Sequence, residues 1–237
     1  MSRTFKKIAY GTLYLVILGL VLFLFFRSRP LPLPKAPSIS DNPLSSIVVE
    51  EKESFRFGGD RLFVSAKISN SRADAGTRPF SYAFVLRGLN GEELERISDE
   101  DILYPGESVL VYGINALTPS KLISDIDVLI TDADWRDASE FSFPKVSLES
   151  EPALEISDNQ IQVRGVLKNE TSSRISELKA VTTLRDSFGF KVLVTGTILT
   201  NLRSFASREY VIALPFDSEL ARRLQGGRAE VFFYPAN

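Results

Sequence analysis

Three aspartates lie close together in the segment TDADWRD, and their carboxylates could bind a hard cation such as Ca²⁺. A calcium-binding loop supplies six or more oxygen atoms, with a glycine at its turn and a bidentate glutamate. Asp132, Asp134 and Asp137 lack both of these neighbours, and Arg136 lies among them. We interpret the segment as a solvated loop that follows a strand, with a cation site as the alternative. The acidic run 98–101 is interpreted in the same way, as a polar connection before an apolar pair.

Two further motifs are associated with specific chemistry. Ser176 and Lys179 fit S-x-x-K, the nucleophile pattern of penicillin-binding enzymes. That chemistry needs the serine at the start of a helix and the motifs S-D-N and K-T-G elsewhere. Both motifs are missing, and the segment around Lys179 has a strand pattern. The triplet from Asn169 to Thr171 is a glycosylation sequon, which has meaning only in a cell that glycosylates its proteins.

The chain contains no histidine and no cysteine. The first absence removes the commonest general base and the commonest transition-metal ligand, and the second removes disulfides and thiol chemistry. We predict no catalytic residues, no cofactor, no metal site and no small-molecule substrate, and hence a protein that is not an enzyme. The alternative is a hydrolase of envelope glycans, because paired carboxylates need neither histidine nor cysteine. A cleft that holds two carboxylates would favour the hydrolase.

The longest apolar run extends from Ile8 to Phe26 and has no charged residue in nineteen positions. As an α-helix it would be roughly 28 Å long, close to the thickness of the hydrocarbon core of a bilayer. A buried core helix is usually shorter or amphipathic, and a cleaved signal peptide has a shorter apolar region that ends at small residues. We therefore predict a single transmembrane helix from Ile8 to Phe26 that anchors the protein in the lipid bilayer.

The charges are distributed unevenly along the chain. Residues 1–35 contain six basic and no acidic residues, which leaves 22 basic and 30 acidic residues in the rest. The basic tail, residues 1–7, predicts a cytoplasmic N-terminus and therefore an extracytoplasmic C-terminal part in the cell membrane. The acidity of that part argues against nucleic acid as a partner, because nucleic acid needs a basic surface. Residues 27–45 contain five prolines between Pro30 and Pro43, which predict a stiff, extended linker or, alternatively, a ligand for a proline-recognition domain.

Short strands are predicted after the linker. The segment 61–70, RLFVSAKISN, alternates apolar and polar residues, which indicates a strand with one buried face. The segment 80–87 alternates as well, and Asn90-Gly91 and Pro105-Gly106 indicate turns. Thr118-Pro119 predicts the capped start of a short helix, and a final strand is predicted at 127–131.

The second half of the chain repeats this order. Residues 160–169 match 61–70, and both segments end at an asparagine, Asn70 and Asn169. Further matches pair 178–185 with 80–87 and 207–214 with the strand around Val111, and a capped helix is predicted to begin at Asp217 and to end at Gly226-Gly227. A period of about 100 residues indicates two copies of one domain.

We place these copies at residues 46–141 and 142–237. About seven short strands in each copy, with frequent turns, predict an antiparallel β-sandwich of immunoglobulin-like size. The predicted fold is therefore all-β, with an N-terminal transmembrane helix, a Pro-rich stalk and two tandem immunoglobulin-like antiparallel β-sandwiches.

Each copy contains, in order, an alternating strand that ends in asparagine, a second strand, a glycine turn and a further strand, which in the first copy follows Pro-Gly. This order resembles the FxLYD-type domain, a family of small β-sandwich modules in bacterial and archaeal envelope proteins. Phe84 and Leu86 match two positions of the naming motif in the first copy, and Leu184 and Asp186 match two in the second. The whole layout is similar to membrane-anchored proteins of unknown function from candidate-phylum bacteria. This resemblance implies a fold and an envelope location, and it implies no activity. We expect a non-enzymatic, membrane-anchored envelope protein whose modules bind a partner protein or act as a structural spacer.

Overall fold

A computed structural model of the chain describes residue 18 and residues 43–57, 60–157, 159–214 and 216–236. The chain divides into two compact units, Met1–Asp41 and Asn42–Asn237. The predicted membrane span from Ile8 to Phe26 lies outside the described residues apart from Leu18, as do the basic tail and most of the linker. Among the described residues, no helix is long and apolar enough to span a membrane.

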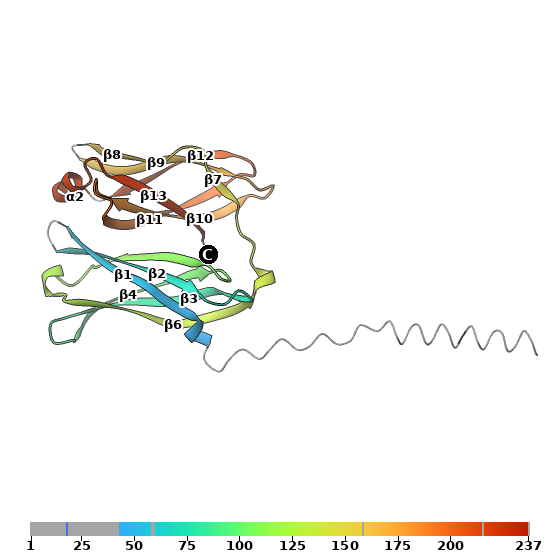
Figure 1. Ribbon diagram of the computed structural model, residues 1–237, viewed down its shortest axis with the longest axis horizontal. Coiled ribbons are helices and arrows are strands. Elements are labelled where there is room, and N and C mark those ends of the chain that lie inside the picture. The colour runs from blue at the N-terminus through green and yellow to red at the C-terminus, as the bar shows by residue number, and fades with distance from the viewer. Residues whose placement is uncertain (1–17, 19–42, 58–59, 158, 215, 237) are drawn as a thin grey trace, which may run out of the picture. The chain divides into compact units, whose positions relative to one another are not determined.

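The second unit is built almost entirely of antiparallel strands, so the all-β prediction is confirmed (Figure 1). What we call module 1 contains β1 (Ile47–Phe57), β2 (Arg61–Asn70), β3 (Ala75–Arg87), β4 (Glu93–Leu103), β5 (Ser108–Ile114) and β6 (Asp125–Asp137). Module 2 contains β7 (Val146–Leu148), β8 (Ala153–Ser157), β9 (Gln160–Asn169), β10 (Ile175–Arg185), β11 (Lys191–Leu202), β12 (Ser207–Leu214), helix α2 (Ser218–Arg223) and β13 (Arg228–Pro235). Single 3₁₀ turns lie at η1 (Pro43–Ser46), η2 (Ser120–Leu122) and η3 (Ala138–Glu140).

These strands form four sheets that lie in successive layers (Figure 1). Module 1 pairs its strands in the orders β1-β2-β5 and β4-β3-β6. Module 2 pairs its strands in the orders β11-β10-β13 and β12-β9-β7, and β8 also pairs with β9. Each module encloses an apolar core between its two sheets, as expected for sheets with one apolar face each.

The two modules repeat the same register at their first strands. Ile47 lies opposite Asn70 in module 1, and Val146 lies opposite Asn169 in module 2. The repeat is imperfect at one point. The β1–β2 ladder is continuous but shifts its register after Val49, whereas in module 2 the equivalent strand is interrupted between β7 and β8. A β-bulge in one copy thus corresponds to a break in the other.

The predicted turns are confirmed. Gly91 and Gly106 have φ angles of 82° and 70°, values that glycine adopts without steric cost. Helix α2 is capped as predicted, because the Asp217 carboxylate accepts hydrogen bonds from the N–H groups of Glu219 and Leu220. The capped helix predicted at Thr118 is only partly correct, since η2 is a single 3₁₀ turn without a side-chain cap.

Two segments predicted to be polar loops are strands. The run 98–101 lies inside β4, and Asp132, Asp134 and Asp137 lie inside β6. Both strands are edges of the sheet β4-β3-β6, where side chains can point to solvent and where charges discourage pairing with other chains. Loss of apolar alternation therefore marks a sheet edge here and not the end of a strand.

A buried carboxylate fixes the loop that follows β5. Glu95, which is 8% exposed, accepts hydrogen bonds from the backbone N–H groups of Ala116, Leu117 and Thr118. Burial acts to raise the pKa of Glu95, but these three donors outweigh it and hold the pKa below its usual value.

We therefore expect Glu95 to contribute to acid stability. Because its pKa is lower in the folded state, the carboxylate stabilises the fold above the unfolded pKa of about 4.3, and this stabilisation is lost as the pH falls through the folded pKa. Glu95→Gln should lower the free energy of unfolding by about 1–3 kcal/mol at pH 7 and by less at pH 3. Urea denaturation of Asn42–Asn237 at both pH values would check this, and an equal loss at both would contradict it.

Candidate functional site

The two modules meet through one sheet of each, and the first half of the central strand β2 is buried on both faces. Sequence alternation predicted that one face of β2 would be exposed, and this prediction holds for Lys67 and Ser69 but is wrong for the first half of the strand. Phe63 and Ser65, on the face expected to be solvated, are 3% and 1% exposed. The physical reason is that sheet β1-β2-β5 of module 1 lies against sheet β11-β10-β13 of module 2 (Figure 1).

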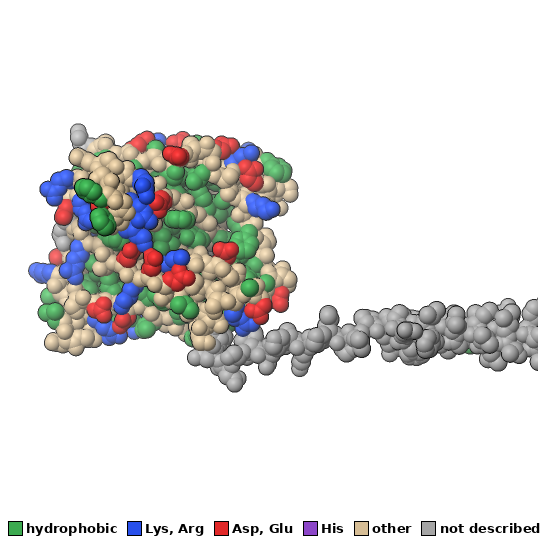
Figure 2. All heavy atoms as spheres, in the orientation of Figure 1, with side chains coloured by type: hydrophobic (Ala, Val, Ile, Leu, Met, Phe, Trp, Pro, Cys, Tyr) green, Lys and Arg blue, Asp and Glu red, His purple; other side chains and the backbone are tan. Residues whose placement is uncertain are grey.

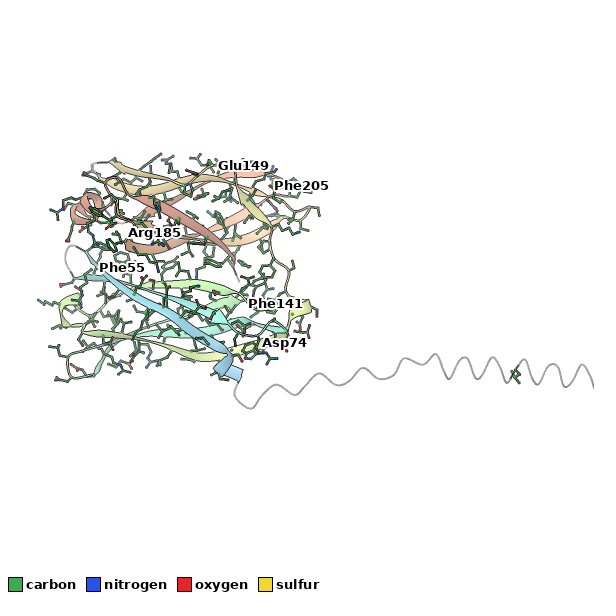
Figure 3. The ribbon with its side chains drawn as sticks, viewed as in Figure 1. Phe55, Asp74, Phe141, Glu149, Arg185 and Phe205 are labelled. Carbon is green, nitrogen blue, oxygen red and sulfur yellow. The ribbon has the colours of Figure 1, made fainter. Side chains whose placement is uncertain are left out.

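Aromatic side chains fill the middle of this junction. Phe55, Phe57 and Phe63 of module 1 pack into the apolar cluster of module 2, and the rings of Phe57 and Phe63 meet edge-on at 5.9 Å. Figure 3 labels Phe55 on β1 of module 1 and Arg185 at the end of β10 of module 2, on opposite sides of the junction. In return, Tyr234 of module 2 packs against the cluster of module 1. Burial of such rings stabilises a contact by roughly 1.5–3 kcal/mol each.

A buried ion pair joins the modules beside these rings. The Lys179 ammonium on β10 donates to the Oδ2 atom of Asp101 on β4, and both side chains are almost fully buried. The Oδ1 atom of Asp101 accepts the N–H of Ile102 at 2.8 Å, and Lys179 lies 5.4 Å from the centre of the Tyr112 ring. Burial raises the pKa of Asp101, and Lys179 opposes the rise.

A second polar contact closes the junction on the side of β1. Lys191 bridges Glu51 and Glu53, with Nζ–Oε2 distances of 2.7 and 3.1 Å. Burial acts to lower the pKa of Lys191, but the two carboxylates hold it above its usual value. Figure 2 shows basic and acidic side chains gathered along the seam between the modules. The packing is also close at Gly196, where an added Cβ would lie 3.0 Å from the Tyr112 hydroxyl. The junction is therefore held by apolar, ionic and steric contacts together.

Two hollows open along the junction. The first has a volume of about 360 Å³ and is acidic; it is lined by Asp99, Glu100, Asp101, Tyr112, Glu177, Lys179, Ile198 and Ala236. We call it the acidic pocket. The second has a volume of about 270 Å³ and contains Tyr104, Phe143, Phe233 and Tyr234 among its lining residues. Phe143 lies over Tyr104 with 4.2 Å between ring centres.

The acidic pocket has the carboxylates that a hydrolase would need, but the buried one is fully engaged. Both oxygens of Asp101 accept hydrogen bonds from the protein, so neither is directed at a substrate. Asp99 accepts a hydrogen bond from the Tyr82 hydroxyl at 3.4 Å, and Glu100 accepts one from Ser81 at 3.2 Å. In the described part of the chain, Asp99, Glu100 and Glu177 form no ion pair. The pocket therefore offers uncompensated negative charge to a ligand.

The aspartates of TDADWRD are not brought together around an ion. Asp134 pairs with Arg136 at 2.6 Å, while Asp137 caps η3 by accepting from Ser139. Asp132 accepts the N–H of Ala133. Across the described ranges, no group of three or more acidic side chains is placed to hold a metal ion.

The two remaining sequence motifs serve the fold. Ser176 and Lys179 both lie on β10, where residues three apart point to opposite faces, so they do not form a nucleophile pair. Asn169 is completely buried, and its amide donates to the carbonyls of Ser173 and Arg203. The folded domain therefore cannot present the sequon to a glycosylating enzyme.

Sequence reasoning missed the junction and its central residue, Asp101. Alternation shows that a strand buries one face, but it cannot show that a second module covers the other. One signal was present: Phe63 is a large apolar residue on the face of 61–70 that was expected to be exposed. Apart from Phe55 and Phe57, the residues of the cluster that it enters come from module 2, so no local pattern identifies them.

No protein-family model matches the sequence, and no curated protein matches it. Among solved structures, the chain is similar to the C-terminal globular domain of an oligosaccharyltransferase from Pyrococcus abyssi, with 12% identity, a TM-score of 0.20, and coverage of 81% of this chain and 47% of that one. It is also similar to the N-terminal CBM22-1–CBM22-2 tandem domain of Xyn10C from Paenibacillus barcinonensis, with 7% identity, a TM-score of 0.18, and coverage of 82% and 89%. The chain spans about half the length of the first of these structures. Neither likeness is close enough to transfer a function.

Proposed function

We propose that this chain is a single-pass, membrane-anchored envelope protein without enzymatic activity, and that its two extracytoplasmic modules are tandem immunoglobulin-like β-sandwiches that bind a partner protein. The observation that carries the proposal is the module junction, with its buried rings and the Lys179–Asp101 pair. A junction of this kind keeps the surfaces of both modules at a fixed separation. Rigid presentation lowers the entropic cost of binding, which suits a recognition unit. It would equally suit a structural spacer.

The predicted helix from Ile8 to Phe26 supplies the anchor in this proposal. The basic tail favours a cytoplasmic N-terminus, and the resemblance to FxLYD-type domains favours an envelope location. The alternative, a hydrolase of envelope glycans with paired carboxylates, is favoured by one observation, the acidic pocket at the junction. Turnover of glycan by the purified protein, abolished by Glu177→Gln, would establish the alternative.

The proposal is tested by labelling intact cells with a membrane-impermeant, lysine-reactive crosslinker. We expect adducts at Lys67 and Lys168, which are partly exposed, and a reproducible protein partner attached to them. Lys179 provides an internal control, because its buried ammonium should react only after denaturation. Adducts that form only after cell lysis would place the modules in the cytoplasm, and labelling without a partner would favour the spacer.

A further inference from the structure

The sheet edges of the two modules differ in how they are protected. Natural edge strands carry charges, prolines or bulges that discourage pairing with other chains. Edge strands β4 and β6 each contain six charged residues, and β1 contains five. Strand β11, a twelve-residue edge, contains only Lys191, at its first position. Strand β5 is also uncharged but has only seven residues, and its Tyr112 ring lies against Lys179 of module 2.

The outer side of β11 is open only in its C-terminal half. Residues 192–195 are 0–8% exposed, whereas Ile198 is 48% exposed and Thr200 and Asn201 are exposed. Its sequence from 192 to 201, VLVTGTILTN, is rich in the β-branched residues that favour strand pairing. At one end Arg208 donates to the carbonyl of Thr200. In the part of the chain that the structure describes, no hydrogen bond other than those of the β10–β11 ladder involves the backbone of residues 196–199, which follow the buried half of the strand.

The acidic pocket lies beside this edge. Ile198 of β11 is one of its lining residues and is 48% exposed. Asp99, Glu100 and Glu177 line the same pocket. A strand that paired with β11 would place alternate side chains on the face that Ile198 occupies, beside these carboxylates.

We propose that β11 is the docking edge for an extended segment of a partner protein, which adds as a further strand and places a Lys or Arg side chain in the acidic pocket. This inference rests on the proposed function and specifies the surface and the chemistry of recognition. Main-chain hydrogen bonds to the free edge supply affinity, and the carboxylates select a basic side chain. A second copy of the chain fits poorly, because two acidic pockets would be brought close together.

The test uses the full-length chain in its own cells, with a photoreactive p-benzoylphenylalanine in place of Thr200 on β11. A matched control carries the same group in place of Val211 on β12, another edge strand. We expect irradiation to attach a partner protein at position 200 and not at position 211. Mass spectrometry of the attached partner peptide should find Lys or Arg in the segment that contacts β11.

A blocking variant sharpens the test. Ile198→Glu adds a negative charge to the edge and to the pocket, and it should lower the yield of the adduct at position 200 at least tenfold. Val211→Glu, at a side chain that is 39% exposed, should change that yield less than twofold. Equal thermal unfolding of the two variants would show that both fold.

Three outcomes would overturn the inference: no adduct at position 200, an adduct with a second copy of the chain, or a yield that Ile198→Glu leaves unchanged. If lysine crosslinking still captured a partner in those cases, the proposed function would stand and only the β11 edge would be wrong. If lysine crosslinking also captured no partner, the proposed function would fail with it.

Discussion

Replacing Lys179 with methionine is expected to lower the free energy of unfolding of Asn42–Asn237 by about 3–5 kcal/mol at pH 7. The variant leaves the Asp101 carboxylate buried without its cation, and an uncompensated buried charge costs far more than the ion pair itself contributes. Urea denaturation measures the loss. The matched control is Arg136→Met, which breaks the half-exposed pair with Asp134 and should cost less than about 1 kcal/mol. Equal losses in the two variants would contradict a buried charge pair at the junction.

The pH dependence of the Lys179→Met variant gives a second readout of the same pair. Burial already raises the pKa of Asp101, and without Lys179 the pKa should rise further. A carboxyl whose pKa is higher in the folded state binds its proton more strongly when folded, so acidification favours the fold. The deficit of the variant should therefore shrink as the pH is lowered from 7 toward the unfolded pKa of about 4. A deficit that grows on acidification would show that Asp101 is solvated.

Asn169→Ala is expected to cost about 3–5 kcal/mol, because one buried side chain ties together three segments of module 2. Its Nδ2 donates to the carbonyls of Ser173, Leu202 and Arg203, and its Oδ1 accepts the N–H of Thr171. Alanine would leave these carbonyls, of which that of Leu202 is buried, without the Asn169 donor. Urea denaturation of the variant measures the loss.

The control for this prediction is Thr171→Val, which removes one hydroxyl bonded to the Asn169 Oδ1 atom and should cost about 1 kcal/mol. The repeat provides a further check. Asn70 holds the same place in module 1 and donates to the carbonyls of Ala75 and Tyr104, so Asn70→Ala should destabilise in the same way. A loss below 1 kcal/mol in both asparagine variants would show that water replaces these hydrogen bonds.

Local patterns in the sequence were sufficient to predict the positions of several strands and turns. Alternation placed 61–70 and 160–169 within the observed bounds of β2 and β9, and glycine identified the turns. The patterns failed at the charged edge strands, because β4 and β6 keep their backbone pairing where their side chains no longer alternate. An edge strand can expose polar side chains to solvent while its backbone pairs with the sheet. Composition alone therefore cannot distinguish such a strand from a loop.

The residues of the module junction could not be predicted from the sequence, for a different reason. Lys179 was singled out by an S-x-x-K match, and its actual partner, Asp101, lies in the other module. The repeat period of about 100 residues indicated two similar domains, but whether two such domains are separate or stacked depends on the fit of their outer faces. That fit is a property of residues such as Phe63 and Gly196, whose neighbours come from distant parts of the chain.

The contact of Tyr234 with the cluster of module 1 has a consequence for the order of events during synthesis. A ribosome makes module 1 first, and domains generally begin to fold as they emerge. Phe55, Phe57 and Phe63 would then form an uncovered apolar face until module 2 has been translated. During this interval the exposed apolar face makes the new protein prone to aggregation. Module 1 should therefore depend on a chaperone, or on rapid synthesis of module 2, even though its own core can form.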